Sequence, residues 1–151
     1  AYIQFGWPYE TTMAMARLVL SGIMEKYPNL KVVVHHCGAM LPFFAKRALL
    51  GVPEPGEVMN LTRPPLEYYK KFYSDTVLGG NTAALMCGYA FFGADHMVFG
   101  SDYPYPGGAA RADFALGEVI KSVEAMAIPD EEKVRIFSKN TRQLLKLSTA
   151  P

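Results

Sequence analysis

The chain has 151 residues, of which 50% are hydrophobic, 13% aromatic and 19% charged; this composition suits one compact domain and excludes intrinsic disorder. Its 15 Lys and Arg residues nearly balance 14 Asp and Glu residues, and the net charge is +1. Such a weak field, without any run of Lys or Arg, excludes nucleic acid and anionic lipid as partners recruited by charge. The longest apolar runs also fall short of the ~20 residues that a membrane span needs.

The first fifty residues predict a helix, a short strand and a second helix. Gly6 and Pro8 interrupt regular structure, and Thr11 or Thr12 is placed to cap the helix that follows. The predicted elements are a loop over 1–10, a helix over 12–27, a strand over 30–36 that is covered on both faces, and a helix over 40–50. The apolar residues that recur at helical spacing in the first helix are Met13, Ala16, Leu20, Ile23, Met24 and Tyr27.

The rest of the chain alternates strands with helices. Prolines make residues 51–66 a long loop. Asn81 is expected to cap a helix that Gly93 ends. The predicted elements are a helical turn over 67–72, a strand over 72–78, a helix over 82–92, a strand over 95–102, a turn over 103–108, a helix over 112–126 and a helix from about 128 to 147.

This order of elements predicts an α/β fold. Short buried strands that alternate with helices favour a parallel sheet with right-handed crossovers. Three strands are fewer than a doubly wound sheet usually has, and a closed (β/α)8 barrel needs eight strands and ~250 residues. The chain is therefore either a small three-stranded layer or part of something larger. The apolar segment that follows Ala1 favours a start partway through a larger polypeptide.

Polar residues follow the predicted strands, at the edge where parallel α/β folds place their reactive groups. The first strand ends at His35 and His36, the second contains Asp75, and the third ends at Asp102. A histidine and two carboxylates at one edge could bind a metal or exchange protons. The alternative is that both aspartates cap the following turns and that His35 has a structural role.

The histidines differ in their expected positions. Adjacent side chains on a strand point to opposite faces, so at most one of His35 and His36 should face a central site. His96 begins the third predicted strand, at the opposite edge, and is expected to be structural or exposed.

The remaining motifs give weaker indications. Cys37 and Cys87 are not in CxxC spacing and have no secretory context, so we expect two reduced core thiols and a cytoplasmic protein. Gly107 and Gly108 lack the spacing of a phosphate-binding loop, and no serine lies in a GxSxG elbow. Four loop aromatics could line a pocket or plug one: Trp7, Tyr9, Tyr103 and Tyr105.

Four motifs resemble the amidohydrolase-2 branch of the amidohydrolase superfamily. They are PYETT over 8–12, YPNLKV over 27–32, HCGAMLPF over 36–43 and GSDYP over 100–104. That branch includes aminocarboxymuconate-semialdehyde decarboxylase and the resorcylate and dihydroxybenzoate decarboxylases. The resemblance implies a TIM (β/α)8 barrel with a divalent metal, zinc or manganese. Residues 1–151 would be the C-terminal part of one such barrel domain, with the fifth helix and about the last three βα units.

The resemblance also assigns roles to single residues. Asp102 matches the metal ligand of the eighth strand, and His36 matches a histidine of the sixth strand that acts in acid–base chemistry. Arg47 matches an arginine that binds the substrate carboxylate across a dimer interface. Tyr105 falls at a substrate-contacting aromatic, and Trp7 is grouped with it as a substrate-binding residue. Asp75 matches an acidic position to which no role is assigned.

Some of the family's pattern is not present in this sequence. No H-x-H pair and no histidine precede His35, so the metal ligands of the first and fifth strands are not found. The chain is therefore not expected to hold the metal securely by itself, because catalytic zinc sites take about three protein ligands. Cys37 also stands where the family has a glycine.

The expected function is that of a metal-dependent decarboxylase (carboxy-lyase) or hydrolase. Its substrate would be a small carboxylated aromatic or a muconate-like compound, and hydration is a third reaction on the same scaffold. The alternative is a catalytically incomplete half-barrel that acts only as a folding or association unit. Because open strand edges and apolar surface favour pairing, we expect a homo-oligomer or pairing with the missing half of the barrel.

Overall fold

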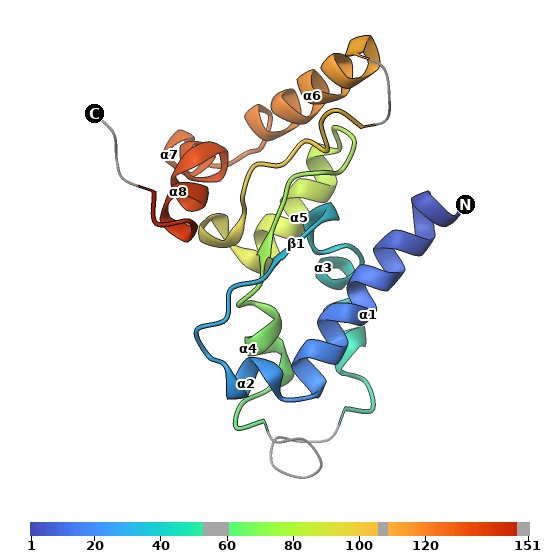
Figure 1. Cartoon of the computed structure of the whole chain (residues 1–151), viewed down its shortest axis with the longest axis vertical. Coiled ribbons are helices and arrows are strands. Elements are labelled where there is room, and N and C mark those ends of the chain that lie inside the picture. The colour runs from blue at the N-terminus through green and yellow to red at the C-terminus, as the bar shows by residue number, and fades with distance from the viewer. Residues whose placement is uncertain (53–60, 106–108, 148–151) are drawn as a thin grey trace.

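The computed structural model describes residues 1–52, 61–105 and 109–147, and it is rich in short helices (Figure 1). The helices and strands are α1 (Trp7–Leu20), α2 (Ile23–Lys26), β1 (Val33–Val34), α3 (Leu41–Phe44), α4 (Pro65–Tyr69), β2 (Tyr73–Ser74), α5 (Thr82–Phe92), α6 (Ala109–Glu124), α7 (Asp130–Val134) and α8 (Asn140–Leu144). Tighter or wider helical turns cover Tyr2–Gly6, His36–Gly38, Arg47–Leu49, Ala94–His96 and Arg135–Lys139. Among these elements no helix is long and apolar enough to cross a membrane.

The sheet is parallel, as expected, but its strands are much shorter than the sequence predicts. Strands β1 and β2 pair in parallel over two residues each. The predicted strand over 95–102 is reduced to one parallel bridge between Ser74 and Met97, and a helical turn occupies its first residues. Within the described residues nothing extends the sheet beyond β1, and Val33 is 49% exposed. The prediction that the first strand is covered on both faces is therefore wrong for this chain.

The N-terminal segment is helical, so the predicted loop over 1–10 is wrong. Pro8 lies in the first turn of α1, where its missing N–H would have no partner within the helix anyway. Thr12 does not cap the helix: its hydroxyl donates to the carbonyl of Pro8 (2.8 Å) and accepts from the backbone N–H of Met40 (3.1 Å). This contact joins α1 to the segment that begins α3.

The core face of α1 also differs from the prediction. Its buried residues are Thr11, Met15 and Val19. The helix ends at Leu20, and a left-handed Gly22 (φ 79°) separates it from α2. The predicted stripe runs through this break: Met24 is buried, as expected, but Tyr27 is half exposed. The largest fully buried side chains elsewhere include Tyr68, Tyr69, Phe72, Leu85, Met97, Met126 and Ile136.

Three later predictions are confirmed. Asn81 caps α5, because its side-chain oxygen accepts the N–H of Ala84 at 3.0 Å, and Gly93 (φ 75°) ends that helix. Helix α6 covers residues 112–124 of the helix predicted over 112–126, and α7, a wide turn and α8 form the predicted terminal helix. The helix predicted over 40–50 becomes α3 and a separate turn. Parts of the predicted loop over 51–66 and turn over 103–108 lie outside the described residues.

Helix α5 packs against the turn after β1 through Gly88. A Cβ added to Gly88 would lie 2.1 Å from the Sγ of Cys37, which is buried. A Cβ added to Gly117 of α6 would meet nothing within 4 Å. Both helices should gain ~1 kcal/mol of helix propensity from Gly→Ala. Only Gly88→Ala adds overpacking, which typically costs about 1–3 kcal/mol.

We therefore expect Gly88→Ala to be about 1–3 kcal/mol less stable than Gly117→Ala in urea unfolding. Adding Cys37→Ala to Gly88→Ala removes the sulfur atom and should recover most of this difference. Equal stabilities of the two single variants would contradict the close packing of α5 on the turn.

Candidate functional site

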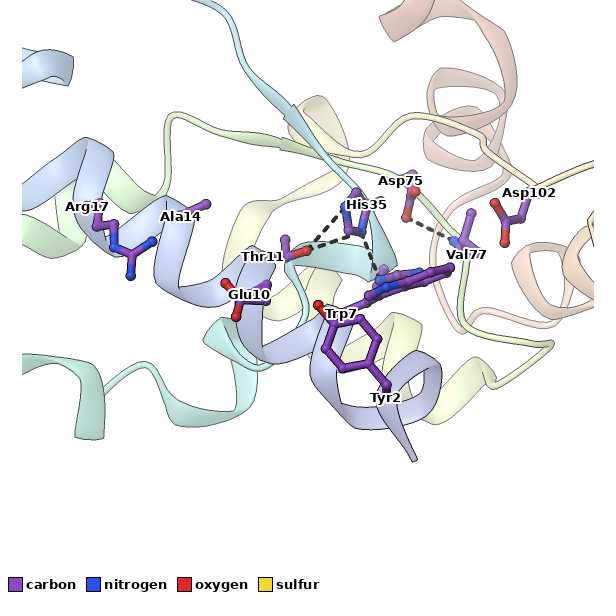
Figure 2. A pocket seen from close by; sticks show the side chains of 11 residues that line it. Tyr2, Trp7, Glu10, Thr11, Ala14, Arg17, His35, Asp75, Val77 and Asp102 are labelled. Atoms are coloured by element: carbon purple, nitrogen blue, oxygen red, sulfur yellow. Dashed lines mark hydrogen bonds between the residues drawn. The ribbon is translucent and has the colours of Figure 1, made fainter.

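A cavity of about 570 Å³ opens beyond the carboxyl ends of β1 and β2. Figure 2 shows that α1 contributes one wall and that the segments after the strands contribute the other. The residues that line it are Tyr2, Trp7, Glu10, Thr11, Ala14, Arg17, His35, His36, Asp75, Val77 and Asp102. The structure thus brings together the histidines and both aspartates that the sequence places after separate strands.

Both histidines line this cavity, so the prediction that only one could face a central site is wrong. Strand β1 ends at Val34, and the backbone of His36 is left-handed (φ 54°), so strand alternation no longer applies. The Nδ1 atoms of the two rings lie 2.8 Å apart, and one donates a hydrogen bond to the other. The hydroxyl of Thr11 also lies 3.2 Å from Nε2 of His35, which joins the pair to α1.

The ionisation of the cavity residues reflects their burial. Partial burial lowers the pKa of His36, electrostatic repulsion from the neighbouring His35 lowers it further, and the carboxylates of Asp75 and Asp102 oppose this. Burial raises the pKa of Asp75, against hydrogen bonds from the N–H groups of Cys37 and Val77. Neutral imidazole is therefore favoured at His36, which suits a group that exchanges protons.

Cys37 is not a nucleophile in this site. Its side chain is buried, and burial raises the pKa of its thiol to about 12. Thiolate, not thiol, is the reactive form. Cys37 and the half-buried Cys87 are both free, as the sequence predicts.

A second cavity of about 630 Å³ adjoins the first and is mainly apolar. The two cavities share His36, Val77 and Asp102, and Tyr105 lines only the second. Trp7 lines only the first. His36 and Asp102 therefore line both cavities, of which the first has mostly polar and charged residues around it and the second mostly apolar ones.

Arg47 lines neither of the two cavities that His36 and Asp102 share. It lines a third cavity of about 280 Å³ on another side of α1, with residues such as Thr12 and Met13. His96 lies where it was expected, at the other end of β2, with its ring centroid 4.8 Å from that of Tyr73.

Three residues of α1 that line the first cavity were missed from the sequence: Glu10, Thr11 and Arg17. With Trp7 and Ala14 they recur at spacings of three and four residues, which marks one face of a helix. The signal was present in the sequence, but the loop predicted over 1–10 concealed it.

The described residues do not complete a metal site. Asp102 and His36 offer a carboxylate and an imidazole, donors that suit manganese and zinc. However, no group of three or more His, Cys, Asp or Glu residues in the described part of the chain is arranged to hold an ion. The donor chemistry fits a divalent metal, but the number of donors does not.

Comparisons with known proteins agree on one family. The profile of the family described as amidohydrolase (Amidohydro_2) matches residues 1–147. The chain is 32% identical over 135 residues to 6-methylsalicylic acid decarboxylase of Penicillium expansum, covering 89% of this chain and 40% of that protein. It is 28% identical to 2-amino-3-carboxymuconate-6-semialdehyde decarboxylase of Dictyostelium discoideum, covering 94% of this chain and 38% of that one.

A solved structure has the same fold over this region. It is a dihydroxybenzoic acid decarboxylase from Polaromonas sp. JS666 with bound manganese and the inhibitor 2-nitroresorcinol. The TM-score is 0.77 at 27% identity, and the match covers 95% of this chain and 42% of that one. The chain thus spans about two fifths of the length of the relatives that it matches.

Proposed function

We propose, from the premise that this chain belongs to the amidohydrolase family, that it forms part of the active site of a metal-dependent decarboxylase for small aromatic carboxylates. The observation that carries this proposal is the position of His36 and Asp102 on the wall shared by two cavities. The decarboxylases among its relatives support the choice of reaction over hydrolysis.

His36 is the proposed proton-transfer residue. In decarboxylation the bond between the carboxylate carbon and the ring carbon breaks, CO₂ leaves, and the electron pair stays on the ring carbon. That carbon must then receive a proton. The imidazole of His36 reaches both cavities and contacts a second imidazole, so the pair can pass a proton from one ring to the other.

Asp102 is the proposed metal ligand of this chain. Manganese, the metal of the related dihydroxybenzoate enzyme, would serve to orient substrate oxygens and balance their charge when bound. Zinc is the alternative. Because no three His, Cys, Asp or Glu residues of the described part are arranged to hold an ion, the remaining ligands would come from other barrel units.

The two cavities suggest how the substrate is divided between them. The apolar space lined by Tyr105 suits the ring and its substituents. Trp7 lines the first cavity, which is the proposed place of the carboxylate. Arg17 is the one Lys or Arg among the described residues that line this space, which makes it a candidate partner for the carboxylate. Arg47, in its separate cavity, would serve a carboxylate only in a neighbouring subunit's site.

The second candidate is a half-barrel that acts through association. It accounts for the open edge of β1 and for exposed aromatic side chains such as Tyr2 (66% exposed) and Phe5 (76% exposed). We propose that the chain corresponds to about the last three βα units of a (β/α)8 barrel. Further units, in the same polypeptide or in a partner, would cover these surfaces.

The proposed location of the protein is the cytoplasm, which suits the free thiols of Cys37 and Cys87.

The test is release of ¹³CO₂ from carboxyl-labelled 6-methylsalicylate, a dihydroxybenzoate and aminocarboxymuconate semialdehyde. It is performed with added Mn²⁺, on the chain alone and on the chain joined to the remaining barrel units. In D₂O the product should carry deuterium at the vacated carbon. Methyl esters of the same acids report hydrolysis instead. Ester cleavage without CO₂ release would replace the decarboxylase by a hydrolase, and inactivity of both forms would favour the association unit.

A further inference from the structure

We propose that Asp75 is a positioning residue, which holds the His36 imidazole toward the two cavities by fixing the backbone turn that carries it. The inference rests on the proposed role of His36 and adds a residue that acts on it. Asp75 itself lines the first cavity, directly after β2 (Figure 2).

The turn that carries His36 is strained. Four successive residues, 36–39, have positive φ, and three of them are not glycine: His36 (54°), Cys37 (52°) and Ala39 (56°). L-residues rarely adopt this region, and such a conformation persists only where its surroundings impose it. Some group outside the turn must therefore hold it.

The carboxylate of Asp75 is that group. Its Oδ1 accepts the backbone N–H of Cys37 at 3.0 Å, in the middle of the left-handed turn. The same oxygen accepts the N–H of Val77 at 3.0 Å, which anchors the carboxylate to its own segment. Hydrogen bonds to a charged acceptor are stronger than those between neutral groups, and this one is partly buried.

Packing restricts Asp75 on its other side. A Cβ added to Gly100 would lie 3.0 Å from the Cβ of Asp75. Gly100 lies two residues before Asp102, so Asp75 sits between the turn that carries His36 and the segment that carries Asp102. Movement of its carboxylate would disturb the relative position of both site residues.

The matched variants are Asp75→Asn and Asp75→Ala. The asparagine variant keeps an oxygen that can accept the N–H of Cys37 and removes the charge. The alanine variant removes both. Asp113→Ala changes an exposed aspartate of α6 outside both cavities and serves as the control.

Two measurements on the chain report the turn without requiring activity. They are amide hydrogen exchange at Cys37 and Val77, and the ¹⁵N imidazole resonances of His36. In Asp75→Ala the Cys37 amide should exchange at least ~10-fold faster, since its acceptor is lost. In Asp75→Asn exchange should stay near wild type while the His36 resonances shift, because a nearby negative charge is removed. Asp113→Ala should leave both unchanged.

A third measurement, on the active enzyme, separates positioning from binding. Asp75→Ala should lower kcat by about 10²-fold with little change in KM, as expected when a reacting group is misplaced, and Asp75→Asn should recover most of the loss. Two results in Asp75→Ala overturn the proposal. One is unchanged hydrogen exchange at the Cys37 amide, and the other is faster exchange at this amide with an unchanged kcat.

If Asp75→Ala does not fold, Asp75→Asn decides the matter, because unshifted His36 resonances or lost Cys37 protection in that variant overturn the proposal. The proposed function can also fail by itself. If the exchange rates and resonances change as expected but the protein releases no CO₂, the positioning role of Asp75 is supported and the decarboxylase function is rejected.

Discussion

Asp102→Asn is expected to remove most of the bound metal and nearly all turnover from the proposed decarboxylase. The substitution keeps the shape of the side chain, and Asn tolerates the left-handed backbone of this position (φ 62°) better than most residues. It removes the negative charge, and with it an anionic donor among a small number of ligands. If the transition state loses several kcal/mol of stabilisation, the rate falls by about 10³-fold or more.

Metal content after dialysis and the initial rate of CO₂ release measure the two parts of this effect. The free energy of unfolding measured in urea should change little, because Asp102 is exposed and is not part of the core. Asp113→Asn, on the exposed surface of α6, is the matched control. Full metal occupancy and wild-type turnover in Asp102→Asn would reject Asp102 as a ligand.

His36→Asn is expected to lower kcat by about 10²–10⁴-fold while the metal stays bound. Asn again suits the left-handed backbone (φ 54°), so the turn after β1 should be preserved. The variant removes the ring that contacts His35 and reaches both cavities. The loss should lie in kcat, because proton transfer is slowed and the cavity walls are otherwise kept.

His96→Asn provides the matched control for this variant, since His96 lies at the other end of β2 and lines neither cavity. Turnover and metal content are measured together for both variants. If His36→Asn is as active as His96→Asn, then proton transfer belongs to another group. If His36→Asn also loses the metal, His36 is a ligand and not the proton carrier.

Local sequence determined the order of the helices in the second half of the chain and the boundaries of α5. Asn81 and Gly93 bound α5 through a side-chain cap and a positive φ, and both signals depend only on neighbouring residues. Alternation of strands with helices was enough to predict parallel pairing, because the intervening helix returns the chain to the same end of the sheet. The same order placed His36, Asp75 and Asp102 at one edge.

Tertiary structure decided what these signals left open. Pro8 predicts a break in regular structure, yet it lies in the first turn of α1, and the face of α1 from Glu10 to Arg17 then forms a wall of the site. Strand β1 shortens to two residues, since a parallel strand depends on neighbours on both sides and β1 has one among the described residues.

The positions of the site residues depended on contacts between distant segments. His35 and His36 share one cavity because the carboxylate of Asp75, 38 residues beyond Cys37 in the chain, bonds the N–H of Cys37 in a left-handed turn. No local pattern predicts a positive φ at His36, because residues other than glycine adopt a positive φ only uncommonly. Sequence by itself therefore determined which residues are available at the edge of the sheet. Only the packing of α1, the turn and the segment of Asp102 decided which of them meet.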